Sequence, residues 1–373
     1  MVSVLYVSAA ALGAMVAVLA IVVLGHHVIT SRARRRFAEK LAAVTALLAP
    51  HVVARAGLHD AVLEARRVHG HRAVATVLRR WRSELEGPSG FAVSRVLVEI
   101  GEVARLTRAA RTMRRDRRLE AIRGLAECGG ASASELLTFT ADSDPVAEIR
   151  RAAREGLLTV GSRVAADSAV RSYLRDVRHG RGWRRSFFAS IAERAPDRLR
   201  ELIDSGQLIV ADERLGLEAL GDAGDVSAIE AARARLLRHA PELRAASARA
   251  LGKLRDGHSV PVLVRLLSDP VWYVRAAAAR ALGALPLDKS ASLALGRALR
   301  DPTWWVRAKA AQSLSLHGAD GVEALISAVG GGDRYASEMA LSTLAVLDLP
   351  ANTRRELSRL GPLATNSDPA GAP

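Results

Sequence analysis

The sequence predicts an all-α protein, an α-solenoid of stacked helix pairs preceded by a single transmembrane helix. Three observations predict this fold. The phrase DPVWYVR at residues 269–275 returns 32 residues later as DPTWWVR at 301–307, and apolar residues extend a similar period over much of the chain. Aromatic residues are only 4% of a composition rich in Ala, Leu, Val and Arg, without long strand-like alternation. A fixed period in the thirties is typical of repeats that stack only on their neighbours.

Residues 1–28 are predicted to be a transmembrane anchor. Val2 to Leu24 is a run of 23 residues without a charge, about 35 Å long as a helix, against roughly 30 Å for a bilayer core. Basic residues follow this run and none precedes it, so we expect an outside N-terminus, a cytoplasmic solenoid and an inner-membrane location. The alternatives are a signal peptide and a buried helix. The basic residues expected at the membrane surface are Arg32, Arg34, Arg35, Arg36 and Lys40.

Residues 29–114 are predicted to be a basic helical juxtamembrane region, with degenerate repeats as one interpretation. Helices are expected at 37–48, ending at Pro50, and then at 52–68, 73–85 and 91–106. Between Arg32 and Arg123 there are 21 Lys and Arg against 9 Asp and Glu, so this third carries +12 of the formal net charge of +15.

Residues 115–350 are predicted to form the solenoid, because a regular register begins there. One apolar position near the end of each second helix recurs at intervals of 29 to 34 residues. These register residues are Leu125, Leu157, Ile191, Leu220, Leu251, Leu282, Leu314 and Leu344. An arginine lies seven residues before six of them, and Glu213 and Ser337 take its place in the other two. Residues 351–373 are predicted to be a mostly disordered tail with a short helix at 353–360.

Within the repeated phrase, most residues have a structural explanation. Asp269 is predicted to cap the following helix, and Pro270 to occupy its first position, where no hydrogen-bond donor is lost. Val274, Ala278 and Leu282 fall on one apolar stripe that faces neighbouring helices. The same roles are expected in the second copy.

These phrases resemble HEAT repeats, in particular the bacterial form found in phycobilin-lyase-like proteins. The resemblance is clear over residues 115–347 and faint over 32–114. It implies that the Asp and the Arg six residues later form a ladder between repeats. The pairs that match this pattern are Asp269/Arg275, Asp301/Arg307 and Asp144/Arg150.

Four aromatic residues of the phrase are the candidate partner-binding residues: Trp272, Tyr273, Trp304 and Trp305. Trp272 and Trp304 lie off the apolar stripe, so we expect them to stand side by side near the concave groove. One interpretation is an aromatic platform for a partner, since exposed aromatic residues dominate many interfaces. The other is that the rings pack across the seam between repeats.

A run of seven arginines between Arg105 and Arg118 steps mostly by three, which predicts several guanidinium groups on one helix face. Three interpretations are open: contact with an anionic membrane or membrane protein, a solvated face, and nucleic-acid binding.

No phosphate loop, nucleophile motif or metal-ligand spacing is present, and Cys128 is expected to be a buried, inert thiol. We therefore expect a non-enzyme without cofactor or metal, a membrane-anchored scaffold that docks a protein partner at the cytoplasmic face. Resemblance to bacterial proteins of this layout implies a membrane glycosyltransferase or envelope system as the partner. The alternatives are a HEAT-like lyase or DNA glycosylase, and a nucleic-acid binder that uses the basic third.

Overall fold

The computed structural model describes residues 31–54, 56–85, 87–176, 180–286, 289–347 and 353. Among these residues every regular element is a helix, which confirms the predicted all-α repeat fold. The chain divides into two compact units, residues 1–175 and 176–373. The predicted anchor at Val2–Leu24 lies outside the described residues, as do the tail and nearly all of the helix predicted at 353–360. The predicted boundaries at 28, 114 and 350 stay predictions.

Unit 1 is built from two layers of antiparallel helices. In one layer α3, α6 and α8 follow one another, and in the other α5, α7 and α9 cover them. The helices of this unit are Ser31–Ala54, α2 (Leu58–His69), α3 (His71–Glu84), α4 (Gly87–Glu99), α5 (Glu102–Ala110), α6 (Arg115–Cys128), α7 (Ala131–Ser143), α8 (Ala147–Val160) and α9 (Arg163–Arg175).

Two predicted helix boundaries in unit 1 are wrong. The helix expected to end at Pro50 continues to Ala54. Proline removes only one donor from the ladder, and Val44 and Leu48 are fully buried just before it. The helix expected over residues 91–106 is two helices, because Gly101 has φ 78°, a left-handed conformation that ends α4 before α5 begins.

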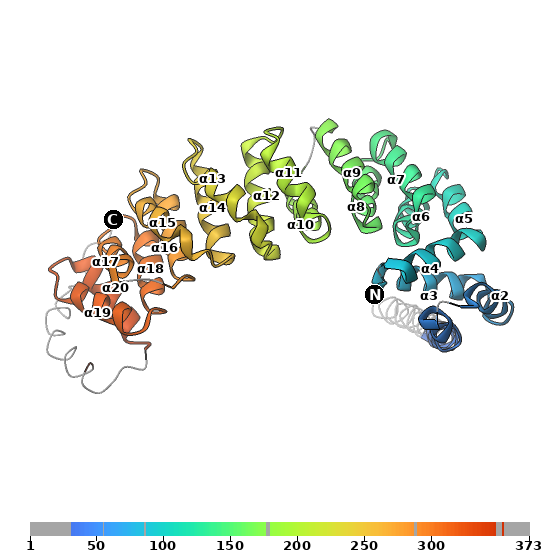
Figure 1. Ribbon diagram of the computed structural model, residues 1–373, viewed down its shortest axis with the longest axis horizontal. Coiled ribbons are helices and arrows are strands. Elements are labelled where there is room, and N and C mark those ends of the chain that lie inside the picture. The colour runs from blue at the N-terminus through green and yellow to red at the C-terminus, as the bar shows by residue number, and fades with distance from the viewer. Residues whose placement is uncertain are drawn as a thin grey trace, which may run out of the picture. The chain divides into compact units, whose positions relative to one another are not determined.

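Unit 2 is a regular stack of helix pairs (Figure 1). The even-numbered helices form one layer, and from α10 to α18 they contact one another more closely than the odd-numbered helices do. We call the even-numbered layer the inner layer, since the more closely packed layer lies on the inside of a curved stack. The helices are α10 (Arg181–Arg194), α11 (Pro196–Asp204), α12 (Val210–Ala223), α13 (Ile229–Arg235), α14 (Pro241–Lys253), α15 (Val260–Leu266), α16 (Trp272–Leu282), α17 (Lys289–Ala298), α18 (Trp304–Leu314), α19 (Gly318–Val329) and α20 (Arg334–Leu344), with 3-10 turns at Val226–Ala228 and Gly257–Ser259.

The predicted repeat register is confirmed. All eight register residues, from Leu125 to Leu344, are at most 2% exposed. The predicted stripe in α16 is also buried, since Val274, Ala278 and Leu282 have no exposed surface. The sequence therefore determined which side of each inner helix faces the core.

Glycines allow the inner helices to approach closely. A Cβ atom added to Gly252 of α14 would lie only 2.7 Å from the Cα of Ala281 in α16, and Gly221 of α12 stands in the same relation to Ala250. Contacts under 3 Å between a Cβ and a backbone atom require the helices to move apart. The spacing of the inner layer therefore depends on the absence of a side chain at these positions.

The predicted start of the phrase helix is wrong by two residues. α16 begins at Trp272, after Val271, and Pro270 lies in the preceding turn. The Asp269 carboxylate accepts a hydrogen bond from the backbone N–H of Val271 at 2.9 Å, and Asp301 repeats this contact with Thr303. The aspartate therefore closes a turn that precedes the helix and does not cap the first turn of the helix. Asp side chains commonly accept a hydrogen bond in this way from the backbone N–H two residues later.

We predict that Gly252→Ala destabilises the protein by about 1–3 kcal/mol, because the clash with α16 outweighs the helix propensity that alanine gains. Gly296→Ala is the matched control: it also lies inside a helix, and its added Cβ would meet only Ala324 at an ordinary 3.6 Å. The control should gain about 0.5–1 kcal/mol. Urea unfolding of both variants measures the difference, and equal stabilities would contradict the close-packing argument.

Candidate interaction surface

Arginines of the inner layer join each repeat to the next. Arg275 donates through Nη1 to the backbone carbonyl oxygens of Asp269 and Pro270, at 2.9 and 3.3 Å, and so holds the turn of its own repeat. Its Nε and Nη2 donate to the two carboxylate oxygens of Asp301 in the following repeat, at 2.6 and 2.9 Å. The Arg side chain is 13% exposed and the Asp 8%. Bidentate pairs of this kind combine charge with fixed geometry.

The ladder between repeats that the resemblance implied is therefore present. Arg275 reaches the aspartate six residues before it only through the backbone carbonyl, and its side-chain pair is with the aspartate of the next repeat. The ladder also extends to repeats that lack the full phrase. The further connections are Arg118–Asp144 at 3.4 Å, Arg184–Asp212 at 3.0 Å and Arg244–Asp269 at 2.7 Å.

At Glu213, where the sequence has an acid in place of the arginine, the charges are exchanged. Arg235 of α13 is 6% exposed and donates to Glu213 at 2.9 Å and to Asp204 at 2.7 Å. The link between repeats survives with the arginine supplied by an outer helix. Sequence register alone could not show this, because Arg235 belongs to no repeating position.

The ladder shifts the acidities of its carboxyl groups. Burial alone would raise the pKa of Asp269, but the hydrogen bonds from Arg244 and from the Val271 N–H, with the nearby guanidinium charges, outweigh it and lower the pKa below its ordinary value. The pKa of Asp301 is lowered in the same way, with Arg275 as donor. These carboxylates are held ionised as structural acceptors, which removes them as proton donors for chemistry near neutral pH.

The aromatic residues of the phrase divide into two roles. Tyr273 is partly buried, and its pKa is raised, first by burial and then by the charge of Glu242, with which it shares a hydrogen bond. It therefore packs at the seam with the preceding repeat. Trp272, Trp304 and Trp305 remain 45%, 52% and 55% exposed. Within each repeat the two rings meet edge to face. Their centroids lie 5.7 Å apart for Trp272–Tyr273 and 4.8 Å apart for Trp304–Trp305.

A further exposed aromatic residue lies at the start of the next inner helix and was missed in the sequence. Tyr335, the second residue of α20, stands nine residues before Leu344, the position that Tyr273 and Trp305 hold before their own register residues. It is 61% exposed. Its ring lies 5.0 Å from the guanidinium carbon of Arg307. The repeat spacing from Leu314 could have identified it. We call Trp272, Trp304 and Tyr335 the aromatic row.

Grooves beside the inner helices contain few uncommitted acids. One of about 560 Å³ lies between α10 and α12, and its acidic lining residues are Glu193, Glu218, Asp222 and Asp225. Three of the four have basic partners: Glu218 with Arg249, Asp222 with Lys253 and Asp225 with Arg200. Among the described residues no group of three or more His, Cys, Asp and Glu side chains could hold a metal ion.

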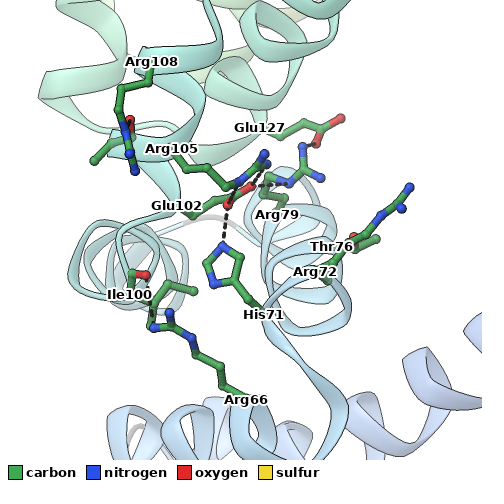
Figure 2. Close-up of polar contacts among 11 residues, drawn as sticks. Arg66, His71, Arg72, Thr76, Arg79, Ile100, Glu102, Arg105, Arg108 and Glu127 are labelled. Atoms are coloured by element: carbon green, nitrogen blue, oxygen red, sulfur yellow. Dashed lines mark hydrogen bonds and ion pairs between the residues drawn. The ribbon is translucent and has the colours of Figure 1, made fainter.

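A fully buried carboxylate, Glu102, organises the basic region of unit 1 (Figure 2). Arg105 donates to both of its oxygens, at 2.7 and 2.8 Å, and His71 Nε2 lies 2.8 Å away. Burial would raise the pKa of Glu102, yet the hydrogen bonds from Arg105 and His71 lower it overall. Arg79 joins this cluster to Glu127 at 3.1 Å, so that α3, α5 and α6 are connected.

The expectation that arginines 105–118 share one helix face is wrong. The run crosses α5, a turn and α6, because α5 ends at Ala110 and α6 begins at Arg115. Three members have acidic partners: Arg105 with Glu102, Arg115 with Glu148 and Arg118 with Asp144. Arg108 instead donates to the backbone carbonyl of Ala104, apart from the Glu102 cluster (Figure 2).

The membrane-surface candidates Arg32, Arg34, Arg35, Arg36 and Lys40 are all exposed on the helix Ser31–Ala54. Among the described residues this helix is the one long and apolar enough to cross a membrane, with a mean hydropathy of 1.4 and 11% burial in its most apolar window. Length and composition alone are weak evidence, since soluble core helices and signal sequences meet the same criterion. One face of the helix also packs in unit 1, where Arg72 lies 5.5 Å from the ring of Phe37.

Comparison with known proteins supports the repeat fold. Residues 214–283 and 229–315 match the family of HEAT repeats. Solved structures with a similar fold include human deoxyhypusine hydroxylase with glycerol, at 18% identity over 69% of this chain and 98% of that chain, with a TM-score of 0.30. The CpcE–CpcF complex of phycocyanin lyase from Nostoc sp. is 16% identical over 69% of this chain and 93% of that chain, with a TM-score of 0.28. A complex of Kap95p with RanGDP is 14% identical over 82% of this chain and 43% of that chain, with a TM-score of 0.36.

The search of curated proteins finds no match. Likeness to the solved structures at such low identity and TM-score assigns no activity or partner to this chain, since one fold supports many functions.

We predict that Arg275→Ala costs about 3 kcal/mol of stability, because the mutation leaves the buried Asp301 carboxylate without its partner. Arg275→Lys should recover little of this loss, since an ammonium group cannot reproduce the two parallel hydrogen bonds. The matched control is Arg334→Ala, which removes the solvent-exposed pair with Glu338 on one helix and should leave stability nearly unchanged. Thermal or urea unfolding distinguishes the variants, and similar losses at both arginines would argue against the ladder.

Proposed function

We propose that this chain is a membrane-tethered helical-repeat scaffold that docks a polypeptide partner on the inner layer of unit 2. The observation that carries the proposal is the aromatic row. Three successive repeats expose an aromatic ring at the start of the inner helix, on the first residue of α16 and of α18 and on the second residue of α20. Inner helices that pack about 8–10 Å apart bring these rings to the same end of the inner layer.

The chemistry of the row favours binding. Large aromatic side chains bury much surface at little entropic cost, and such residues act as interface hot spots. The ladder fixes the helices that carry them, so the rings are ordered before a partner arrives. Trp305 widens the apolar surface next to Trp304, whereas Tyr273 belongs to the seam.

The membrane tether is supported by the sequence of residues 2–24 and by the five exposed basic side chains from Arg32 to Lys40. Positive charge next to an apolar run favours the cytoplasmic face. In this proposal the solenoid lies at the cytoplasmic side of an inner membrane, with a membrane glycosyltransferase or other envelope protein as partner.

We predict that Trp272→Ala combined with Trp304→Ala removes partner binding and leaves the fold intact. Two rings acting as hot spots account for about 2 kcal/mol or more, which is roughly a thirtyfold loss of affinity. Full-length protein solubilised in detergent is used for affinity capture with quantitative mass spectrometry, and circular dichroism checks the helix content.

Leu237→Ala is the matched control, because Leu237 is an apolar residue of the same unit that is 77% exposed and lies outside the row. The control should recover the same proteins as the unmodified chain. If the folded double variant also recovers them, the rings do not bind the partner, and if the variant unfolds, the rings have a structural role instead.

We predict that a reporter fused after Arg36 is cytoplasmic. The basic residues after the apolar run should retain that side of the chain in the cytoplasm. Paired alkaline phosphatase and green fluorescent protein fusions give opposite signals on the two sides of the membrane. Phosphatase activity at this junction would reject the tether in the proposed orientation and leave the docking surface as a separate question.

A further inference from the structure

The turn between α5 and α6 contains a cluster of basic side chains without acidic partners. Arg111 directly follows α5 and Arg114 directly precedes α6, while Arg108 lies in the last turn of α5 and Arg117 in the first turn of α6. All four are exposed, and Arg108 contacts only a backbone carbonyl, that of Ala104. We call Arg108, Arg111, Arg114 and Arg117 the basic collar.

Folding does not explain the half of the collar at the start of α6, Arg114 and Arg117. The N-terminus of a helix carries partial positive charge, so cations in the first turn are unfavourable and anions are favoured. Arg115 offsets this through its pair with Glu148, whereas Arg114 and Arg117 have no such pair among the described residues. Asp116 is the one acid in this turn of α6. These two arginines therefore reduce helix stability in the isolated chain, and an external anion would relieve that cost.

An apolar side chain projects from the middle of the collar. Met113 is 93% exposed, the largest exposure of any large apolar residue in the described part of the chain. The turn that carries it is ordered by backbone hydrogen bonds from Arg111 to Arg108 and from Thr112 to Ala109, both of 3.2 Å. A flexible, unbranched side chain held in water by a rigid turn suits insertion into an apolar medium.

We infer that the α5–α6 turn, residues 108–117, is a contact site for a lipid surface that carries anionic headgroups. The collar binds the headgroups and Met113 enters the boundary with the acyl chains. The charge of the collar matches an anionic leaflet, where each basic side chain near the surface contributes about 1 kcal/mol. The exposed methionine distinguishes a bilayer from RNA or DNA, which would offer phosphates but no apolar layer. The site is separate from the aromatic row and does not depend on the docking proposal.

The test uses the full-length chain with Met113→Cys and an environment-sensitive fluorophore on that cysteine. The native Cys128 does not compete for the label, because it is fully buried and burial raises its pKa to about 12. The protein is incorporated into vesicles of phosphatidylcholine, with or without phosphatidylserine. Phe139→Cys is the matched control: it is 68% exposed, and its helix α7 contains no Lys or Arg.

The expected result is a shift to shorter wavelength, with quenching by lipid-attached quenchers, at position 113 in phosphatidylserine vesicles only. Position 139 should show neither change. Replacing Arg111, Arg114 and Arg117 by glutamine should weaken the insertion about fivefold per charge removed, while thermal stability stays equal or rises. Because the signal comes from one side chain, it does not depend on how the rest of the chain meets the vesicle.

Three outcomes overturn the inference. The first is equal emission with and without phosphatidylserine. The second is a shift that the triple glutamine variant retains in full. The third is the same shift on addition of single-stranded RNA without vesicles, which would assign the collar to nucleic acid.

Discussion

The link from Arg275 to Asp301, repeated at other seams, is the interaction on which the rest of unit 2 depends. One guanidinium holds the turn of its own repeat and the carboxylate of the next, so each repeat fixes the start of its neighbour's inner helix. Removing either group would leave a charge in a site only about a tenth exposed. The close contact between α14 and α16 at Gly252 is compatible with this arrangement, because the absence of a side chain there lets the two helices approach each other.

The ladder changes at its C-terminal end, where the aromatic row also ends. Arg307 holds the carbonyl oxygens of Asp301 and Pro302 as its counterparts do, but its guanidinium stacks on the ring of Tyr335. Asp333 accepts a hydrogen bond from the N–H of Ala336 and so caps its own helix. At this seam the attraction between the Arg307 guanidinium and the Tyr335 ring, which is modest in energy, takes the place of an ion pair. The same substitution places an exposed ring in the first turn of α20, at the repeat position of Tyr273 and Trp305.

The repeat fold could be predicted because it rests on periodic, apolar positions, and every register residue is buried. Details set by one side chain or one backbone angle could not. Pro50 did not end its helix, and Gly101 divided a helix that the apolar pattern joined. The partner of each ladder arginine depends on how the repeats stack, which sequence distance does not reveal. Tyr335 was missed because its repeat lacks the Asp-Pro phrase, and Glu102 because nothing in the sequence marks one glutamate as buried.

Ion pairing sorts the charged and aromatic residues into those used by the fold and those left for other molecules. Carboxylates at the seams, and three of the four beside the α10–α12 groove, pair with arginine or lysine within the fold. Of the phrase, Tyr273 is bound to a neighbour and the tryptophans are not. Of the basic run, Arg105, Arg115 and Arg118 are paired, while Arg111, Arg114 and Arg117 remain exposed around Met113. What the fold leaves uncommitted is apolar rings in unit 2 and a basic, apolar-tipped turn in unit 1, and both are surfaces suited to binding.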